Sequence, residues 1–209
     1  MHKFRASSLA AIMTDPKSKD ELLSVGAKTA IEKLAKQAVY GYEESFGSKY
    51  TDKGIQVEDE AIELYNAVFF TAHKKNTERK TNEWITGEAD IVSPNKIIDI
   101  KSPWSLSTFP ATADSGKDAT YEWQGRAYMW LWNVAEFEIA YCLVNTPTEL
   151  IGYEDERLHF VDHINPELRI TRVKYNRDAV LEAKIATRCE AANQYLDAMI
   201  KRIADEHTF

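Results

Sequence analysis

A β-hairpin is predicted by the stretch Gly87-Glu88-Ala89-Asp90-Ile91-Val92-Ser93-Pro94-Asn95-Lys96-Ile97-Ile98-Asp99-Ile100-Lys101-Ser102-Pro103. Pro94-Asn95 has the chemistry of a turn, because proline presets φ and asparagine tolerates turn conformations. Ile91-Val92 before the turn and Ile97-Ile98 after it are β-branched pairs, which are typical of strands. The hairpin therefore predicts two neighbouring strands of a sheet, and the other segments are interpreted relative to that sheet.

The second hairpin strand carries an acid and a base on one face. Residues two apart in a strand share a face, so Asp99 and Lys101 project together while Ile98 and Ile100 project into a core. Hairpin pairing brings Asp90 alongside them, with the backbone carbonyl of Ile100 in between. Such oxygen ligands suit Mg²⁺, and the lysine could orient or deprotonate a metal-bound water. The alternative is an exposed Asp–Lys pair on an edge strand, which is common and contributes little.

Composition indicates one domain, residues 1–209, with an ordinary proportion of charged (28%) and hydrophobic (44%) residues. The net charge of −7 argues against a surface that is basic throughout and binds nucleic acid over its whole area. A nuclease with a locally basic channel remains compatible with this charge. No apolar run is long enough to span a bilayer, and the first residues lack the core of a signal peptide. Cys142 and Cys189 have no metal-type spacing, so reduced thiols in the cytoplasm are expected.

The remaining segments alternate between helical and strand patterns. Apolar residues at helical spacing predict helices over 7–13, 24–42, 54–73, 119–133 and 177–205, with a short one over 147–158. Strands are expected over 83–90, as the first strand of the hairpin, and over 136–144 and 168–175. The basic run 74–80 is interpreted as a solvated turn or a contact to a DNA backbone, and 104–117 as a long loop. This order fits an α/β fold with a central mixed sheet flanked by helices.

Three polar side chains outside the hairpin stand out. Glu58 lies one turn before Ile62, on the apolar side of its helix, where a carboxylate needs a partner or a metal. Gln124 and Tyr128 are four residues apart and therefore share one helix face. No phosphate-binding glycine loop, serine nucleophile elbow or zinc-protease helix motif is present.

Taken in order, these residues resemble the PD-(D/E)XK nuclease superfamily, and more narrowly the phage recombination exonucleases of the lambda-exonuclease type. The resemblance is carried by residues 54–61, 87–90, 99–103 and 121–128, and by Ala6-Ser7-Ser8. Ala89 replaces the proline that names the superfamily, which is not a ligand. Asp99 stands where glutamate is commoner, and both supply an oxygen.

The resemblance implies a restriction-endonuclease-like core with a two-metal catalytic site for Mg²⁺, with Mn²⁺ as a possible substitute. Asp90, Asp99 and the Ile100 carbonyl would bind one ion, and Glu58 would help to bind a second ion or its water. Lys101 would orient the attacking water. Gln124 would hydrogen-bond near the scissile or terminal phosphate, and Tyr128 would brace its helix.

The resemblance also implies a 5′-to-3′ exonuclease on linear double-stranded DNA that leaves 3′ single strands for recombination. Arg5 and Ser7 would seat the 5′-phosphate, although the basic residue that relatives carry further upstream has no counterpart here. Trp104 would guide one strand to the metals. A ring-shaped homotrimer and a single-strand annealing protein as partner are expected. The alternatives are an endonuclease or single-strand nuclease of the same superfamily, or a non-catalytic DNA-binding or assembly module.

Overall fold

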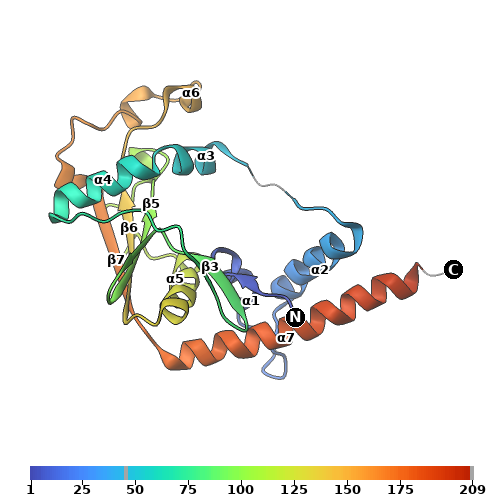
Figure 1. Ribbon diagram of the computed structural model, residues 1–209. Helices are drawn as coiled ribbons and strands as arrows, with labels where there is room; N and C mark the ends of the chain where they lie inside the picture. Colours follow the sequence, from blue (N-terminus) through green and yellow to red (C-terminus); the bar gives the residue numbers. More distant parts are fainter. Residues whose placement is uncertain (45–46, 208–209) are drawn as a thin grey trace.

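The computed structural model describes residues 1–44 and 47–207. A four-stranded sheet lies at its centre, in the order β4 (Ile91–Ser93), β5 (Lys96–Lys101), β6 (Glu136–Cys142) and β7 (Ile170–Asn176) (Figure 1). β5 and β6 are parallel, whereas the β4–β5 and β6–β7 pairs are antiparallel. The sheet is therefore mixed, and helices cover both of its faces, which confirms the expected α/β class.

The predicted hairpin turns at Pro94-Asn95 and pairs Ile91 with Ile98. The strand expected over 83–90 is confirmed as β3 (Ile85–Glu88), but its predicted place in the hairpin is wrong, because β3 belongs to a second sheet and β4 is the first strand of the hairpin. That sheet has the order β1 (Phe4–Arg5), β3 and β2 (Arg79–Thr81). The chain changes sheets at Ala89-Asp90, where Asn76 binds the backbone instead: its N–H donates to Asp90 O at 2.7 Å and its side-chain amide to Ala89 O at 2.9 Å.

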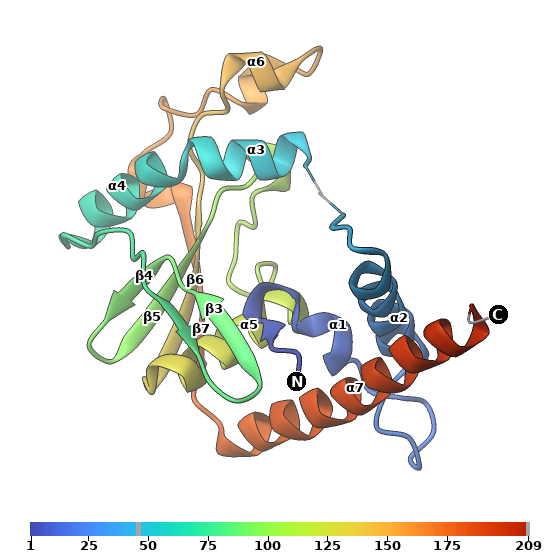
Figure 2. The same cartoon turned by 45° about the vertical axis from the view of Figure 1, so that its right-hand side comes forward.

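One face of the sheet packs on a helical layer made of α1 (Ala10–Met13), α2 (Val25–Tyr40), α5 (Ala119–Trp132) and α7 (Ala179–Glu206). The sheet contributes buried apolar side chains to this layer: Ile97, Phe137, Ile139 and Val173. Both ribbon views show α7 lying beside α2 and passing below α1 (Figures 1 and 2). The closing helix predicted over 177–205 is therefore confirmed, and it supports the layer that carries α5.

The opposite face of the sheet packs on α4 (Glu58–Phe69). Ile98 and Ile100 are buried there against Ile62 and Tyr65, as the strand alternation predicts. Asp99 lies between them in sequence and therefore faces the α5 side. The hairpin thus presents its carboxylate and its lysine toward the helix that carries Gln124.

The helix predicted over 54–73 is two helices, α3 (Lys49–Gln56) and α4, which meet at Val57. α3 begins earlier because the Ser48 hydroxyl caps it, accepting a hydrogen bond from Thr51 N. Glu58 consequently opens a helix rather than lying within one. The helix predicted over 147–158 also breaks, because Gly152 takes a φ of +66° after α6 (Thr148–Ile151).

The remaining segments agree with the prediction in outline. The first predicted helix, 7–13, is a 3₁₀ turn over Ala6–Ser8 followed by α1, and the long loop contains only a 3₁₀ turn at Leu106–Thr108. Further 3₁₀ turns cover Glu156–Leu158 and Pro166–Arg169. Within the described ranges, no helix combines the length and the apolar character needed to cross a membrane.

Candidate active site

Asp90 lies at the break between β3 and β4, directly beside the end of β5. Its Oδ2 accepts a hydrogen bond from Ile100 N at 2.7 Å. Burial raises the pKa of Asp90 to about 8; the negative charges of Asp99 and Glu58 add to this, while Lys101 and the Ile100 N–H oppose it. A carboxyl group with this pKa holds a proton at neutral pH unless a cation replaces it.

Asp99 and Lys101 project together from β5, as predicted. The Asp99 side chain is only 1% exposed, and Lys101 Nζ lies 2.6 Å from its Oδ2. Burial alone would lower the pKa of Lys101, but the charges of Asp99 and Asp90 outweigh it and raise that pKa, so the ammonium stays charged. Lys101 Nζ also lies 4.6 Å from the centre of the Tyr121 ring. The lysine is therefore held between a carboxylate and an aromatic face.

A relay of hydrogen bonds connects Asp99 to the backbone beside Asp90. The Gln124 amide donates to Asp99 Oδ1 at 3.3 Å and to the Tyr128 hydroxyl at 2.9 Å. Tyr128 in turn donates to Glu88 O at 2.9 Å. Burial raises the pKa of Tyr128, so the phenol keeps the proton that it donates. In this structure Gln124 therefore positions a carboxylate, and its contact with a phosphate stays a prediction.

Glu58, the first residue of α4, faces the same region. Its side chain is 21% exposed and pairs with the Lys75 ammonium. The prediction that Glu58 lies on the apolar side of its helix and needs a partner is therefore half right, because the side chain faces a cavity rather than the core. The partner comes from the loop between α4 and β2.

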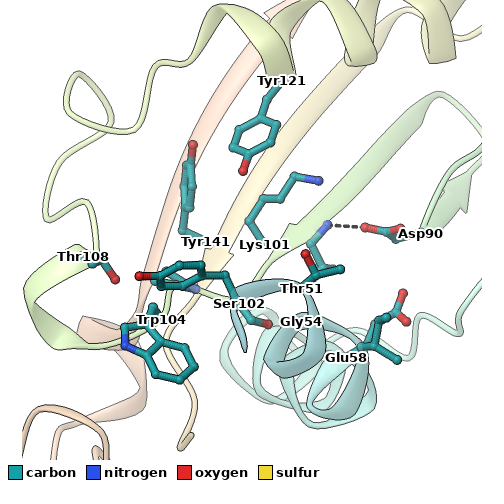
Figure 3. A pocket seen from close by; sticks show the side chains of 14 residues that line it. Thr51, Gly54, Glu58, Asp90, Lys101, Ser102, Trp104, Thr108, Tyr121 and Tyr141 are labelled. Carbon is teal, nitrogen blue, oxygen red and sulfur yellow. Dashed lines mark hydrogen bonds between the residues drawn. The ribbon is translucent and has the colours of Figure 1, made fainter. Parts of the chain in front are cut away.

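A cavity of about 600 Å³ is lined by Glu58, Asp90 and Lys101, and Lys101 connects it to the buried Asp99. Figure 3 shows Glu58 and Asp90 on one side, Lys101 at the centre, and Tyr121 and Tyr141 on the opposite side. The remaining lining comes from α3, from β5 and from the chain after β5, namely Tyr50, Thr51, Gly54, Ile55, Ile100, Ser102, Pro103, Trp104 and Thr108.

The oxygens at and behind this cavity fit a magnesium ion. Asp99 Oδ2 is buried and contacts the Lys101 ammonium at 2.6 Å, and a carboxylate oxygen has a second lone pair that can bind a cation. The described residues contain no cluster of three His, Cys, Asp or Glu side chains that could enclose a metal. Two carboxylates, a backbone carbonyl and waters remain, which is the kind of set that Mg²⁺ accepts.

A second, smaller cavity of about 150 Å³ is lined in part by Tyr128. Arg5 and Ser7, both predicted as phosphate ligands, line it together with Arg79. Arg79 pairs with Glu88 at 3.2 Å. The sequence indicated only that residues 74–80 are basic, and pairing of β2 with β3 is what brings Arg79 to Arg5. Tyr128 borders this cavity while its hydroxyl belongs to the relay that leads to Asp99.

Trp104 lies in the wall of the large cavity and is 7% exposed. Its indole N–H donates to Glu154 at 2.8 Å, and its ring packs edge-on against Tyr50 and His159. Beneath α3, the buried Lys53 ammonium donates to Pro103 O at 2.7 Å and to Trp104 O and Val144 O at 3.1 Å each. The sequence did not single out Lys53, because a lysine among helical polar residues gives no sign of burial.

Comparison with known proteins places this geometry in a family. No protein-family model matches the chain, and no curated protein sequence is similar to it. Among solved structures, a phage-related exonuclease from Haemophilus somnus is 39% identical, covering 97% of this chain and 96% of its own, with a TM-score of 0.91. The alkaline exonuclease LHK-Exo from Laribacter hongkongensis shares the fold at 19% identity, with a TM-score of 0.71 over 98% of this chain and 92% of its own. LHK-Exo has also been solved in complex with dAMP. The chain therefore belongs to the phage-related exonucleases of the lambda-exonuclease type.

Proposed function

We propose that this exonuclease is Mg²⁺-dependent, acts on linear double-stranded DNA and removes nucleotides in the 5′-to-3′ direction. The observation that carries the proposal is that Asp90 and Lys101 line one cavity, where Lys101 pairs with the buried Asp99 carboxylate at 2.6 Å. Asp90, Asp99 and the Ile100 carbonyl are the groups that would hold the ion. Bound there, the ion would act as a Lewis acid on the phosphodiester and offset the charge that develops on it.

The protein's own groups would complete the chemistry. The Lys101 ammonium can hydrogen-bond the attacking water or an oxygen of the phosphate and thereby stabilise its charge. Gln124 and Tyr128 keep the Asp99 carboxylate oriented. Glu58 faces the same cavity and is proposed as the ligand of a second ion or of its water.

A 5′-phosphate would be held in the smaller cavity. Arg5 and Arg79 supply guanidinium groups, which suit phosphate oxygens, and Ser7 lies beside them. Tyr128 lines the smaller cavity, and its hydrogen bond with Gln124 connects it to the Asp99 carboxylate behind the larger one. The complex of LHK-Exo with dAMP supports a mononucleotide as product, because such a product would fit the larger cavity.

The assembly is proposed to be a ring-shaped homotrimer around DNA that hands its 3′ single strand to a single-strand annealing protein. A ring would retain DNA by its topology, which would explain how a chain of net charge −7 can stay on a polyanion.

The test is the digestion of linear duplex DNA with a 5′-phosphate or a 5′-hydroxyl, in Mg²⁺ and in chelator. The wild type should release mononucleotides from the 5′-phosphorylated duplex only when Mg²⁺ is present. Asp99→Ala should lose all measurable digestion. Asp114→Ala, which removes an exposed carboxylate, should retain it.

Other outcomes would point to the alternatives. Cleavage of circular duplex would show an endonuclease, and preference for single strands a single-strand nuclease. No digestion by the wild type, together with no heat of Mg²⁺ binding, would indicate a non-catalytic module. Wild-type digestion by purified Asp99→Ala would remove the proposed mechanism.

A further inference from the structure

A lysine occupies the place beside Glu58 where the second ion is proposed. The Lys75 ammonium pairs with Glu58 Oε2 at the edge of the large cavity. The Lys75 side chain is 46% exposed, so it can leave this position without disturbing the core. Lysine also has a long flexible stem, which lets its charge move between partners.

The backbone holds Lys75 beside the site carboxylates. Its neighbour Asn76 is bonded to the backbone of Ala89 and Asp90, at the chain's break between the two sheets. The ion pair with Glu58 therefore forms directly beside Asp90, so the ammonium lies next to two residues that are proposed as metal ligands.

We propose that Lys75 is a displaceable counter-cation: it neutralises Glu58 until a second metal ion arrives, and then moves to a DNA phosphate. The proposal rests on the proposed function, in which Glu58 takes part in a second ion site.

The charges of the site explain why displacement is required. The Glu58 and Asp99 carboxylates of the site are paired with the Lys75 and Lys101 ammonium groups. A divalent ion at Glu58 would lie next to the Lys75 charge, and like charges at contact distance repel. Lys75 must therefore leave Glu58 before the second ion can bind tightly.

DNA would offer the displaced lysine a new partner. A backbone phosphate beside the cavity carries one negative charge, as the Glu58 carboxylate does, and can take its place as the partner of the ammonium. DNA binding would then favour the second ion, and by linkage the second ion would favour DNA. The enzyme would complete its metal site only when substrate is present.

Counting Mn²⁺ ions by electron paramagnetic resonance and by calorimetry tests the proposal without an activity readout. Lys75→Gln should tighten the second Mn²⁺ site of the DNA-free protein by roughly five- to tenfold, because it removes the competing charge. Lys74→Gln is the matched control: it removes the same charge one residue away, from another exposed side chain, and should change that affinity by less than about twofold. Glu58→Gln should abolish the second site in either background.

A second measurement adds a duplex with non-hydrolysable phosphorothioate linkages. This duplex should tighten the second Mn²⁺ site of the wild type and of Lys74→Gln, and should tighten it less in Lys75→Gln, where no lysine needs to be displaced. Thermal melting of the three proteins checks that the exposed substitutions leave the fold intact.

The measurements distinguish a failure of the proposed function from a failure of the role proposed for Lys75. No Mn²⁺ bound by any variant would contradict the proposed function itself. Equal second-site affinities in Lys75→Gln and Lys74→Gln would overturn the role of Lys75 while leaving the metal site. A weaker second site in Lys75→Gln would also overturn it, because the lysine would then be orienting Glu58 rather than competing for it.

Discussion

Asp99 is a charged residue in a place that water hardly reaches. A buried carboxylate is costly unless charges and hydrogen bonds compensate it. Lys101 compensates Oδ2 by charge, and Gln124 compensates Oδ1 by a hydrogen bond. A carboxylate has about four lone-pair sites, so these two contacts leave sites at which a cation can bind.

Tyr128→Phe tests the relay behind this carboxylate. The change removes the acceptor of Gln124 and the donor to Glu88 O while keeping the ring that packs beside Gly87. Loss of such an outer partner typically costs about ten- to a hundredfold in activity or metal affinity. We expect kcat to fall within that range, measured by single-turnover digestion of 5′-phosphorylated duplex. Tyr195→Phe, which removes only the surface bond to Glu32, should leave kcat unchanged; equal rates for both variants would contradict the relay.

At the scale of elements, the site depends on two helices that are held close to the sheet. α5 approaches β6 because residue 125 is glycine: a Cβ there would lie 2.0 Å from the Phe137 ring. α3 is held over the ends of β5 and β6 by the Lys53 ammonium. Each contact fixes one wall of the catalytic cavity.

Gly125→Ala should push α5 away from the sheet. Overpacking in a closed core costs typically about 1–3 kcal/mol, and this contact is too short to be absorbed by a small shift. We expect a loss in the free energy of unfolding of at least that size in urea denaturation. Gly26→Ala in α2, where the nearest atom is 3.9 Å away, should be neutral or stabilising by about 0.5–1 kcal/mol. An unchanged midpoint for Gly125→Ala would show that α5 is free to move.

The lowered pKa of Lys53 predicts that the free energy of unfolding depends on pH. Burial lowers its pKa from 10.5 to about 8, and the charge of Glu60 opposes this only in part. Between these two pH values the unfolded chain binds the proton and the folded chain releases it, so this lysine's contribution to stability rises with pH. We expect the difference in unfolding free energy between wild type and Lys53→Met to grow in favour of the wild type from pH 7.5 to pH 10, by up to about 3 kcal/mol.

Urea denaturation of both proteins at the two pH values measures this difference, and groups common to both cancel in it. A difference that stays constant, or that shrinks as pH rises, would contradict the burial cost assigned to the Lys53 ammonium.

At the scale of the whole molecule, charge and assembly have to be considered together. The chain has 33 acidic residues against 26 lysines and arginines, so a single copy is repelled by DNA at long range. The cations that face DNA in the proposed function are gathered at two cavities, as Lys101, Arg5 and Arg79. Cations gathered at the two cavities of an acidic chain suit an enzyme that would enclose its substrate.

The proposed ring predicts a mass and a kinetic behaviour. Sedimentation equilibrium should give three times the 23.9 kDa of one chain. Digestion should then be processive: after a chase with unlabelled duplex, an enzyme already on DNA should continue for many nucleotides. A monomer that dissociates after a few nucleotides would contradict the ring, while leaving the exonuclease chemistry untouched.

Local pattern accounts for the parts of the site that lie close together in the chain. Strand alternation places Asp99 with Lys101 and opposite Ile98 and Ile100, and helical spacing places Gln124 with Tyr128. The predicted hairpin was right at its turn and wrong before Asp90, because Asn76, a loop residue, takes the backbone bonds that a longer strand would use. The break at Val57 was also missed, since the Ser48 cap that starts α3 lies among polar loop residues.

The sequence by itself therefore determined the sheet-forming hairpin, the acid–lysine face and the helix face that carries the amide, because each follows from a repeat of two or of 3.6 residues. Only the tertiary structure decided that Gln124 meets Asp99, that Arg79 joins Arg5, that Lys75 covers Glu58 and that Lys53 is buried. Those contacts join residues that are distant along the chain. They depend on how layers pack and strands pair, which no local period encodes.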